Sequence, residues 1–217
     1  LQQMYAWADA FIVGNLVGEG ALAAVGATMS LYNLFVLVIT GLTLGVSILT
    51  ARMFGGGERE GLGAVLSTFT IVLGAAFLAL GAAGCLATGP VLRLMRTPAD
   101  ILEMSRQYLE LVLLGLPFVA VYNVYAAVLR GMGESKAPLY AVVVASLVNV
   151  GMDLLLVGPG DMGVRGAALA TVASQGMMML FIIWYAARRW AALRFRPGRG
   201  CVDRGALRGG LALGLPV

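Results

Sequence analysis

The chain alternates between long apolar runs without a charged residue and short segments that hold most of its charges. Each of the two longest runs exceeds the roughly 20 residues that a helix needs to cross a bilayer. The runs are continuous, whereas strands of a membrane barrel alternate over about 10 residues. The pattern therefore predicts transmembrane helices. The uncharged runs are Ala21–Ala51, Gly61–Leu92, Leu111–Leu129, Ala137–Met152 and Gly166–Ala187.

Turn-forming residues separate these runs and set the limits of the helices. They include the triplets Gly55-Gly56-Gly57, Gly131-Met132-Gly133 and Gly158-Pro159-Gly160. We predict an all-α, polytopic membrane protein with a bundle of six transmembrane helices. Their expected limits are about residues 1–17, Leu22–Phe54, Gly61–Thr88, Pro98–Arg130, Ala137–Val157 and Val164–Trp190.

Composition supports a membrane protein and argues against an enzyme. The chain is 60% hydrophobic and 12% charged, against about 25% charged in soluble domains. It has no histidine, which removes Ser-His-Asp, Cys-His and histidine-metal chemistry. Cys85 and Cys201 show no metal-ligand spacing. We expect no cofactor, and no nucleic-acid partner either, because most of the net charge of +4 sits in one loop.

The distribution of Lys and Arg predicts the orientation of the helices. Eleven of the 15 basic residues fall on the side that would hold the N-terminus, and four on the other side. The positive-inside rule makes the first side cytoplasmic. We expect a multi-pass protein of the cell membrane, such as a bacterial inner membrane, with residues 188–208 in the cytoplasm. The eleven are Arg52, Arg59, Arg130, Lys136, Arg188, Arg189, Arg194, Arg196, Arg199, Arg204 and Arg208.

Both ends of the sequence predict a piece of a longer protein. The first helix reaches Asp9 after eight residues, and the chain turns apolar again from Leu207 to Val217. We expect residues 1–190 to form the first six-helix bundle with a shortened first helix. Residues 191–204 would be a basic loop, and residues 205–217 would begin a seventh helix that belongs to a second bundle.

Two carboxylates lie within apolar helices, Asp9 and Asp153. Burying a charge at the bilayer centre costs at least about 2.5–3.5 kcal/mol, so a functional role is the first hypothesis. The alternative is a polar contact that only packs neighbouring helices. Asn149 shares one helical face with Asp153, and Thr171 shares another with Gln175. By helical rise, Asp9, Asp153 and Thr171 lie about 6–12 Å below the outer ends of their helices. Such oxygens suit a hard cation or a proton.

Other polar groups allow two interpretations. Tyr122 and Asn123 either line a cavity or form hydrogen bonds between helices, and Gln175 is a further candidate for lining a cavity. The motif Gly41-x-x-x-Gly45 indicates close helix packing. The Arg-rich stretch after residue 188 is a topology signal and an anchor to acidic lipid.

An ordered set of motifs resembles the multidrug and toxic compound extrusion (MATE) family. No single motif is specific, but their order covers the chain. They are Asp9-Ala-Phe-Ile-Val-Gly14, Leu22-Ala-Ala-Val-Gly26, Arg52 with Gly55, Gly57 and Glu60, Arg130-Gly-Met-Gly-Glu-Ser-Lys-Ala-Pro138, Asn149-x-x-x-Asp153 and Gly163-x-x-Gly166-Ala-Ala-Leu-Ala-Thr171.

The resemblance implies a twelve-helix transporter with two six-helix bundles, of which this chain matches the first. It also implies a cation-coupling site at Asp9, Asn149, Asp153 and Thr171, which would hold H⁺, or Na⁺ as a metal. The expected function is export of organic, often cationic, drugs in exchange for that ion. The expected partners are these small molecules, the lipid bilayer and the second bundle of the same protein.

Three alternatives compete with this interpretation. A lipid-linked oligosaccharide flippase of the same superfamily would be expected to line its cleft with cationic residues, and the predicted helices bury acids instead. A membrane-embedded enzyme would need paired acids for Mg²⁺ or a nucleophile with a base. A channel would need a selectivity filter, and no segment resembles one.

Overall fold

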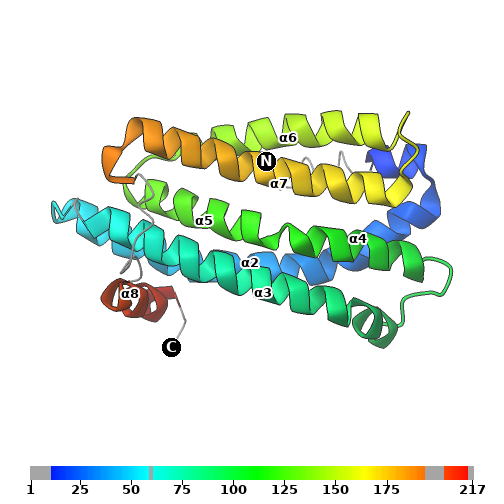
Figure 1. Ribbon diagram of the computed structural model, residues 1–217, viewed down its shortest axis with the longest axis horizontal. Coiled ribbons are helices and arrows are strands. Elements are labelled where there is room, and N and C mark those ends of the chain that lie inside the picture. Colours follow the sequence, from blue (N-terminus) through cyan, green and yellow to red (C-terminus); the bar gives the residue numbers. More distant parts are fainter. Residues whose placement is uncertain (1–10, 59–60, 194–202, 215–217) are drawn as a thin grey trace. The chain divides into compact units, whose positions relative to one another are not determined.

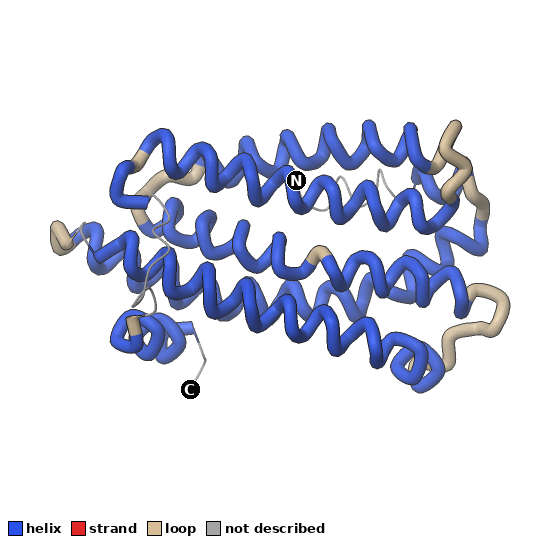
Figure 2. Tube along the Cα trace, in the orientation of Figure 1, coloured by secondary structure: helices blue, strands red, loops and turns tan. Residues whose placement is uncertain are grey.

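Helices account for nearly all of the described chain. The computed structural model describes residues 11–58, 61–193 and 203–214, and Figures 1 and 2 show no strand in these ranges. Residues 11–16 are helical. The elements that follow are α2 (Glu19–Gly55), α3 (Leu62–Leu94), α4 (Leu102–Leu114), α5 (Leu116–Gly131), α6 (Lys136–Leu156), α7 (Gly163–Arg189), the 3₁₀ turn η2 (Ala191–Leu193) and α8 (Arg204–Gly214).

The prediction of an all-α polytopic membrane protein is confirmed. Four described helices, α2, α3, α6 and α7, are long and apolar enough to cross a membrane, and the pair α4 and α5 qualifies as a fifth span. Their limits lie within a few residues of the predicted ones, except for the two differences described next. Most of the first predicted span lies outside the described residues.

The fourth span is broken, whereas the sequence predicted one helix over Pro98–Arg130. Helix α4 begins only at Leu102, and a bend of 42° separates it from α5 at Gly115. Pro117 has no N–H to donate to the carbonyl of Leu113, and its ring crowds that carbonyl. The Gly115 N–H instead donates to the Val112 carbonyl over 3.0 Å, a tighter turn than an α-helix makes.

Helix α3 continues through a proline, whereas the sequence predicted an end at Thr88. Pro90 lies inside α3, which runs on to Leu94. A transmembrane helix tolerates proline because side-chain hydroxyls and neighbouring helices satisfy the backbone groups that it frees. Pro90 frees the Leu86 carbonyl, and in the turn before it the Thr88 hydroxyl donates to the Gly84 carbonyl over 2.8 Å.

The chain divides into two compact units, each of which takes part of every long helix. The first contains residues up to Phe35, Leu78–Leu116 and Val142–Met177. The second contains Val36–Phe77, Pro117–Ala141 and residues from Met178 onward.

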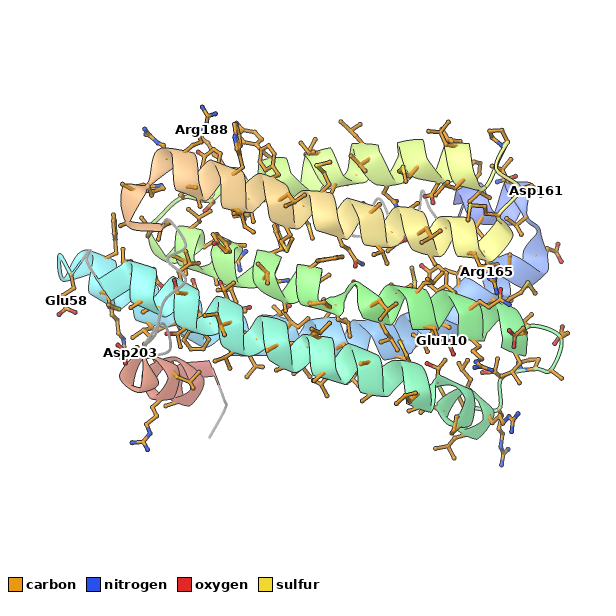
Figure 3. All side chains as sticks on the ribbon, viewed as in Figure 1. Glu58, Glu110, Asp161, Arg165, Arg188 and Asp203 are labelled. Carbon is orange, nitrogen blue, oxygen red and sulfur yellow. The ribbon has the colours of Figure 1, made fainter. Side chains whose placement is uncertain are left out.

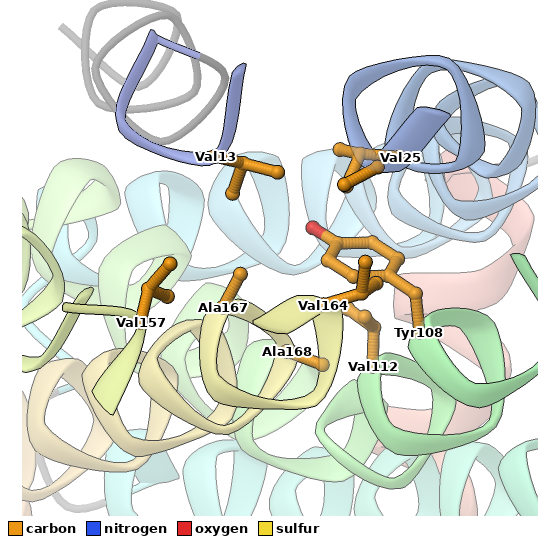
Figure 4. Packing of buried hydrophobic residues seen from close by; sticks show 9 residues of the cluster. Val13, Val25, Tyr108, Val112, Val157, Val164, Ala167 and Ala168 are labelled. Carbon is orange, nitrogen blue, oxygen red and sulfur yellow. The ribbon is translucent and has the colours of Figure 1, made fainter. Parts of the chain in front are cut away.

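The first unit packs around small and β-branched side chains, as Figure 4 shows. Small residues let helices approach closely, which matters in a bilayer because lipid is as apolar as the side chains. Val157, which directly follows α6, belongs to this cluster together with Ala167 of α7 and Val13, which precedes α2. The remaining members are Ala21, Val25, Tyr108, Val112, Val164 and Ala168.

Close helix packing at the Gly41-x-x-x-Gly45 motif is confirmed in the second unit. A Cβ at Gly45 would overlap the Gly210 carbonyl oxygen and stand 2.5 Å from the Gly214 nitrogen. Helix α8 therefore rests directly on the backbone of α2. Asp203 caps α8, because its Oδ1 accepts the N–H groups of Gly205 at 2.7 Å and Ala206 at 3.2 Å. Whether α8 begins a helix of a second bundle stays a prediction.

The described basic residues divide between the two units as they do between the predicted sides of the membrane. Seven of the eleven that were assigned to the cytoplasmic side are described, and all seven belong to the second unit: Arg52, Arg130, Lys136, Arg188, Arg189, Arg204 and Arg208. Arg93, Arg96, Arg106 and Arg165 belong to the first. Which of the two predicted sides faces the cytoplasm stays a prediction.

The break in the fourth span should tolerate only glycine at position 81. Gly81 of α3 lies against the carbonyl that Pro117 leaves without its helical partner: a Cβ there would stand 2.5 Å from the Leu113 oxygen. We expect Gly81→Ala to cost about 1–3 kcal/mol of stability. Thermal unfolding of the purified protein in detergent measures this as a lowered Tm.

Gly89→Ala is the matched control, since it lies on the same helix and nothing stands within 4 Å of its Cβ position. Alanine also favours a helix by about 1 kcal/mol over glycine. Equal Tm values for the two variants would show that the contact between Gly81 and Leu113 does not hold the break in place.

Candidate functional site

Asn149 and Asp153 lie fully buried in the first unit, each with 0% exposure. They are four residues apart on α6 and therefore share one face of the helix. Asp153 is the one charged side chain among the buried residues of the described chain. The α6 carboxylate is therefore enclosed by protein.

The Asn149 amide has unfulfilled hydrogen-bonding capacity. Both its oxygen and its nitrogen are buried and have no hydrogen-bond partner within the described residues. Leaving a buried polar group in this state costs about 1–3 kcal/mol. An amide oxygen beside a carboxylate on the same face is a donor set that suits a hard cation. The two side chains are therefore of the type that a cation site would use.

Packing of α6 against α7 brings the two polar faces to the same level. The helices are joined by a short turn and run side by side in opposite directions (Figure 1). Val157 and Ala167 meet in one packed cluster. One helical turn from that contact on each helix lie Asp153 and Thr171, and a second turn leads to Asn149 and Gln175. The sequence predicted a common depth for Asp153 and Thr171 from helical rise, but not which faces of the two helices meet.

Thr171 and Gln175 are buried in α7, at 8% and 3% exposure. The Gln175 Nε2 donates to the Tyr32 hydroxyl of α2 over 2.9 Å. Its Oε1 occupies the place where a Cβ at Gly115 would stand. Gln175 is thus held between α2 and the break after α4. Neither Tyr32 nor Gly115 was a sequence candidate, since each lies in an apolar run without a polar pattern.

Asp9 lies outside the described residues, so its place in the site stays a prediction. Val13, four residues later, belongs to the same cluster as Val157 and Ala167. Within the described chain, no three His, Cys, Asp or Glu side chains gather in one group.

Tyr122 and Asn123 belong to the second unit and are tied to backbone groups there. The Tyr122 hydroxyl donates to the Pro138 carbonyl of α6 over 3.2 Å, a hydrogen bond between helices. The Asn123 Nδ2 donates to the Val119 carbonyl of its own helix over 2.9 Å. A cavity-lining role for either residue stays a prediction.

Comparison with known proteins agrees with the fold and the ordered motifs. The MatE family model matches residues 1–155. Two probable multidrug resistance proteins of Bacillus subtilis strain 168, YoeA and YpnP, are 33% and 29% identical over 84% and 85% of this chain. The chain covers 40% and 42% of their lengths, so it spans less than half of each relative.

Solved transporters share the fold across nearly the whole chain. A MOP superfamily transporter from Pyrococcus furiosus is 27% identical with a TM-score of 0.88, over 98% of this chain and 47% of that one. An inward-facing multidrug resistance MATE family transporter of the MOP superfamily is 26% identical with a TM-score of 0.84, over 99% of this chain and 49% of that one. The chain belongs to the MATE family of multidrug efflux transporters.

Proposed function

We propose that the protein is a secondary active transporter that exports organic, often cationic, compounds in exchange for H⁺ or Na⁺. Asp9, Asn149, Asp153 and Thr171 would form the coupling site, and no other cofactor would take part. The observation that carries the proposal is the fully buried pair Asn149 and Asp153. A carboxylate is retained inside an apolar bundle at a cost, and reversible charge neutralisation gives it a use.

The coupling would act through a shift between two arrangements of the transporter. Binding of a proton or sodium ion neutralises Asp153 and lowers the cost of keeping it away from water. The ion therefore favours the arrangement in which the carboxylate is most enclosed, and its release favours the other. A second six-helix bundle of the same protein would provide the opposing half, and rocking of one bundle against the other would give alternating access.

The flippase alternative is less well supported. A cleft that holds a lipid-linked pyrophosphate needs cationic groups inside the bundle. None of the Lys and Arg side chains whose exposure is described is buried, while Asp153 is. The buried charge therefore favours a cationic ligand over an anionic one.

Asp153→Asn should abolish ion-driven efflux in the full-length protein. The amide keeps the size of the side chain but cannot gain and lose charge, so the protein should fold and fail to couple. Asp161→Asn is the matched control, because Asp161 is exposed and adopts a φ of 48°, which asparagine accepts readily. Drug efflux from vesicles under an imposed proton or sodium gradient is the measurement. Efflux at the parent rate by Asp153→Asn would remove this carboxylate from the mechanism.

Crosslinking tests whether Asp153 of α6 and Thr171 of α7 face each other at the same depth. Cysteines at positions 153 and 171, in a protein with Cys85 and Cys201 replaced by alanine, should form a disulfide under mild oxidation. Leu154 is 51% exposed on another face of α6, so cysteines at positions 154 and 171 should remain reduced. Gel mobility after protease cleavage of the turn between α6 and α7 distinguishes the two. Equal crosslinking of both pairs would contradict the proposed register.

Orientation in the membrane can be tested with a pair of exposed loop residues, Glu58 and Asp161. In a background without Cys85 and Cys201, an impermeant thiol reagent should label Asp161→Cys on intact cells. It should label Glu58→Cys only after the membrane is opened. The reverse pattern would mean that the basic loops lie outside the cell.

A further inference from the structure

The end of α7 carries an aromatic and basic cluster that the transport proposal does not use. The Phe181 ring lies 5.9 Å from that of Trp184 and 6.5 Å from that of Tyr185, measured between centroids. The Arg188 guanidinium lies 5.5 Å from the centre of the Trp184 ring. Trp184 is 54% exposed, and Figure 3 shows Arg188 pointing away from the packed helices. Aromatic rings beside arginine are typical of the boundary between lipid and water.

Helix α6 adds Lys136 to Arg188 and Arg189 as a third cation at this end of the second unit. Glu134, just before α6, accepts the Lys136 backbone N–H over 3.1 Å and a longer contact of 3.5 Å from the Tyr185 hydroxyl. The start of α6 is thereby tied to the end of α7. The Lys136 side chain is exposed, as are those of Arg188 and Arg189.

These cations have no carboxylate partner within the described chain. The ion pair that is present there, Arg106 with Glu110, belongs to the first unit. In the second unit, Glu134 accepts the Lys136 backbone N–H and the Tyr185 hydroxyl, and Asp203 accepts two backbone N–H groups. Exposed cations left unpaired beside interfacial aromatics can be neutralised by an anion from outside the protein.

We propose that Arg188, Arg189 and Lys136, with Trp184, form a binding site for the phosphate headgroup of an anionic membrane lipid. A guanidinium binds phosphate through two parallel hydrogen bonds. A lipid is favoured over free phosphate because Leu180, one turn before Trp184, is 57% exposed and offers an apolar surface to an acyl chain. Basic groups at the ends of transmembrane helices hold anionic headgroups in this way. The inference does not depend on the coupling ion or the exported compound.

The test compares two brominated lipids as quenchers of Trp184 fluorescence in the purified full-length protein. Quenching by phosphatidylglycerol and by phosphatidylcholine gives the relative affinity at this surface, and a Trp184→Phe protein supplies the background from the other tryptophans. We expect a clear preference for phosphatidylglycerol in the parent. Arg188→Gln and Arg189→Gln should each reduce it about fivefold per charge removed.

Arg93→Gln is the matched control, since Arg93 is exposed and belongs to the first unit. Its preference should equal that of the parent, and soluble glycerol phosphate should not displace the lipid. Equal quenching by the two lipids in the parent, or an equal loss in Arg93→Gln, would overturn the proposal. Displacement of the lipid by glycerol phosphate would overturn the assignment to a lipid and leave a free-phosphate site.

Discussion

A fully buried carboxylate on an otherwise apolar transmembrane helix is the constraint around which the first unit is arranged. Asp153 and Asn149 lie on α6 with no exposed surface, in a medium that offers no water to hydrate a charge. Their burial requires neighbours that pack closely on both sides. A packed cluster of small and β-branched side chains lies close by along the chain: Val157, one turn after Asp153, belongs to it together with Ala167 of α7. The polar pair on α6 and the small-residue cluster next to it therefore belong to one packing arrangement.

The lack of water in the bilayer also explains why glycines and polar groups gather where the helices are irregular. Pro117 frees the Leu113 carbonyl, and Gly81 lets the backbone of α3 approach that oxygen. Gly115 in turn leaves room for the Gln175 amide, whose other end donates to Tyr32. At the break after α4, the irregular backbone is thus packed against other helices. The break in the fourth span is a packed feature of the fold.

Charge and periodicity predicted most of the helices and singled out the residues on which the proposed site rests, while the site itself stays a prediction. The uncharged runs predicted α2, α6 and α7 within a few residues, and the i, i+4 spacing singled out Asn149 with Asp153. The bend at Gly115 and the passage of α3 through Pro90 were not predicted, because proline permits both outcomes and contacts decide between them. Tyr32 was missed because a lone tyrosine in an apolar run has no pattern, and its hydrogen bond joins residues 143 positions apart.

The central claim is that the buried carboxylate on α6 changes its protonation or ion occupancy during transport. Infrared difference spectra of the full-length protein between ion-loaded and ion-free conditions report on carboxyl groups directly. The account predicts a carboxyl band that responds to H⁺ or Na⁺, persists in Asp161→Asn and is lost or reduced in Asp153→Asn. A difference spectrum that is identical in the parent and in Asp153→Asn would contradict it.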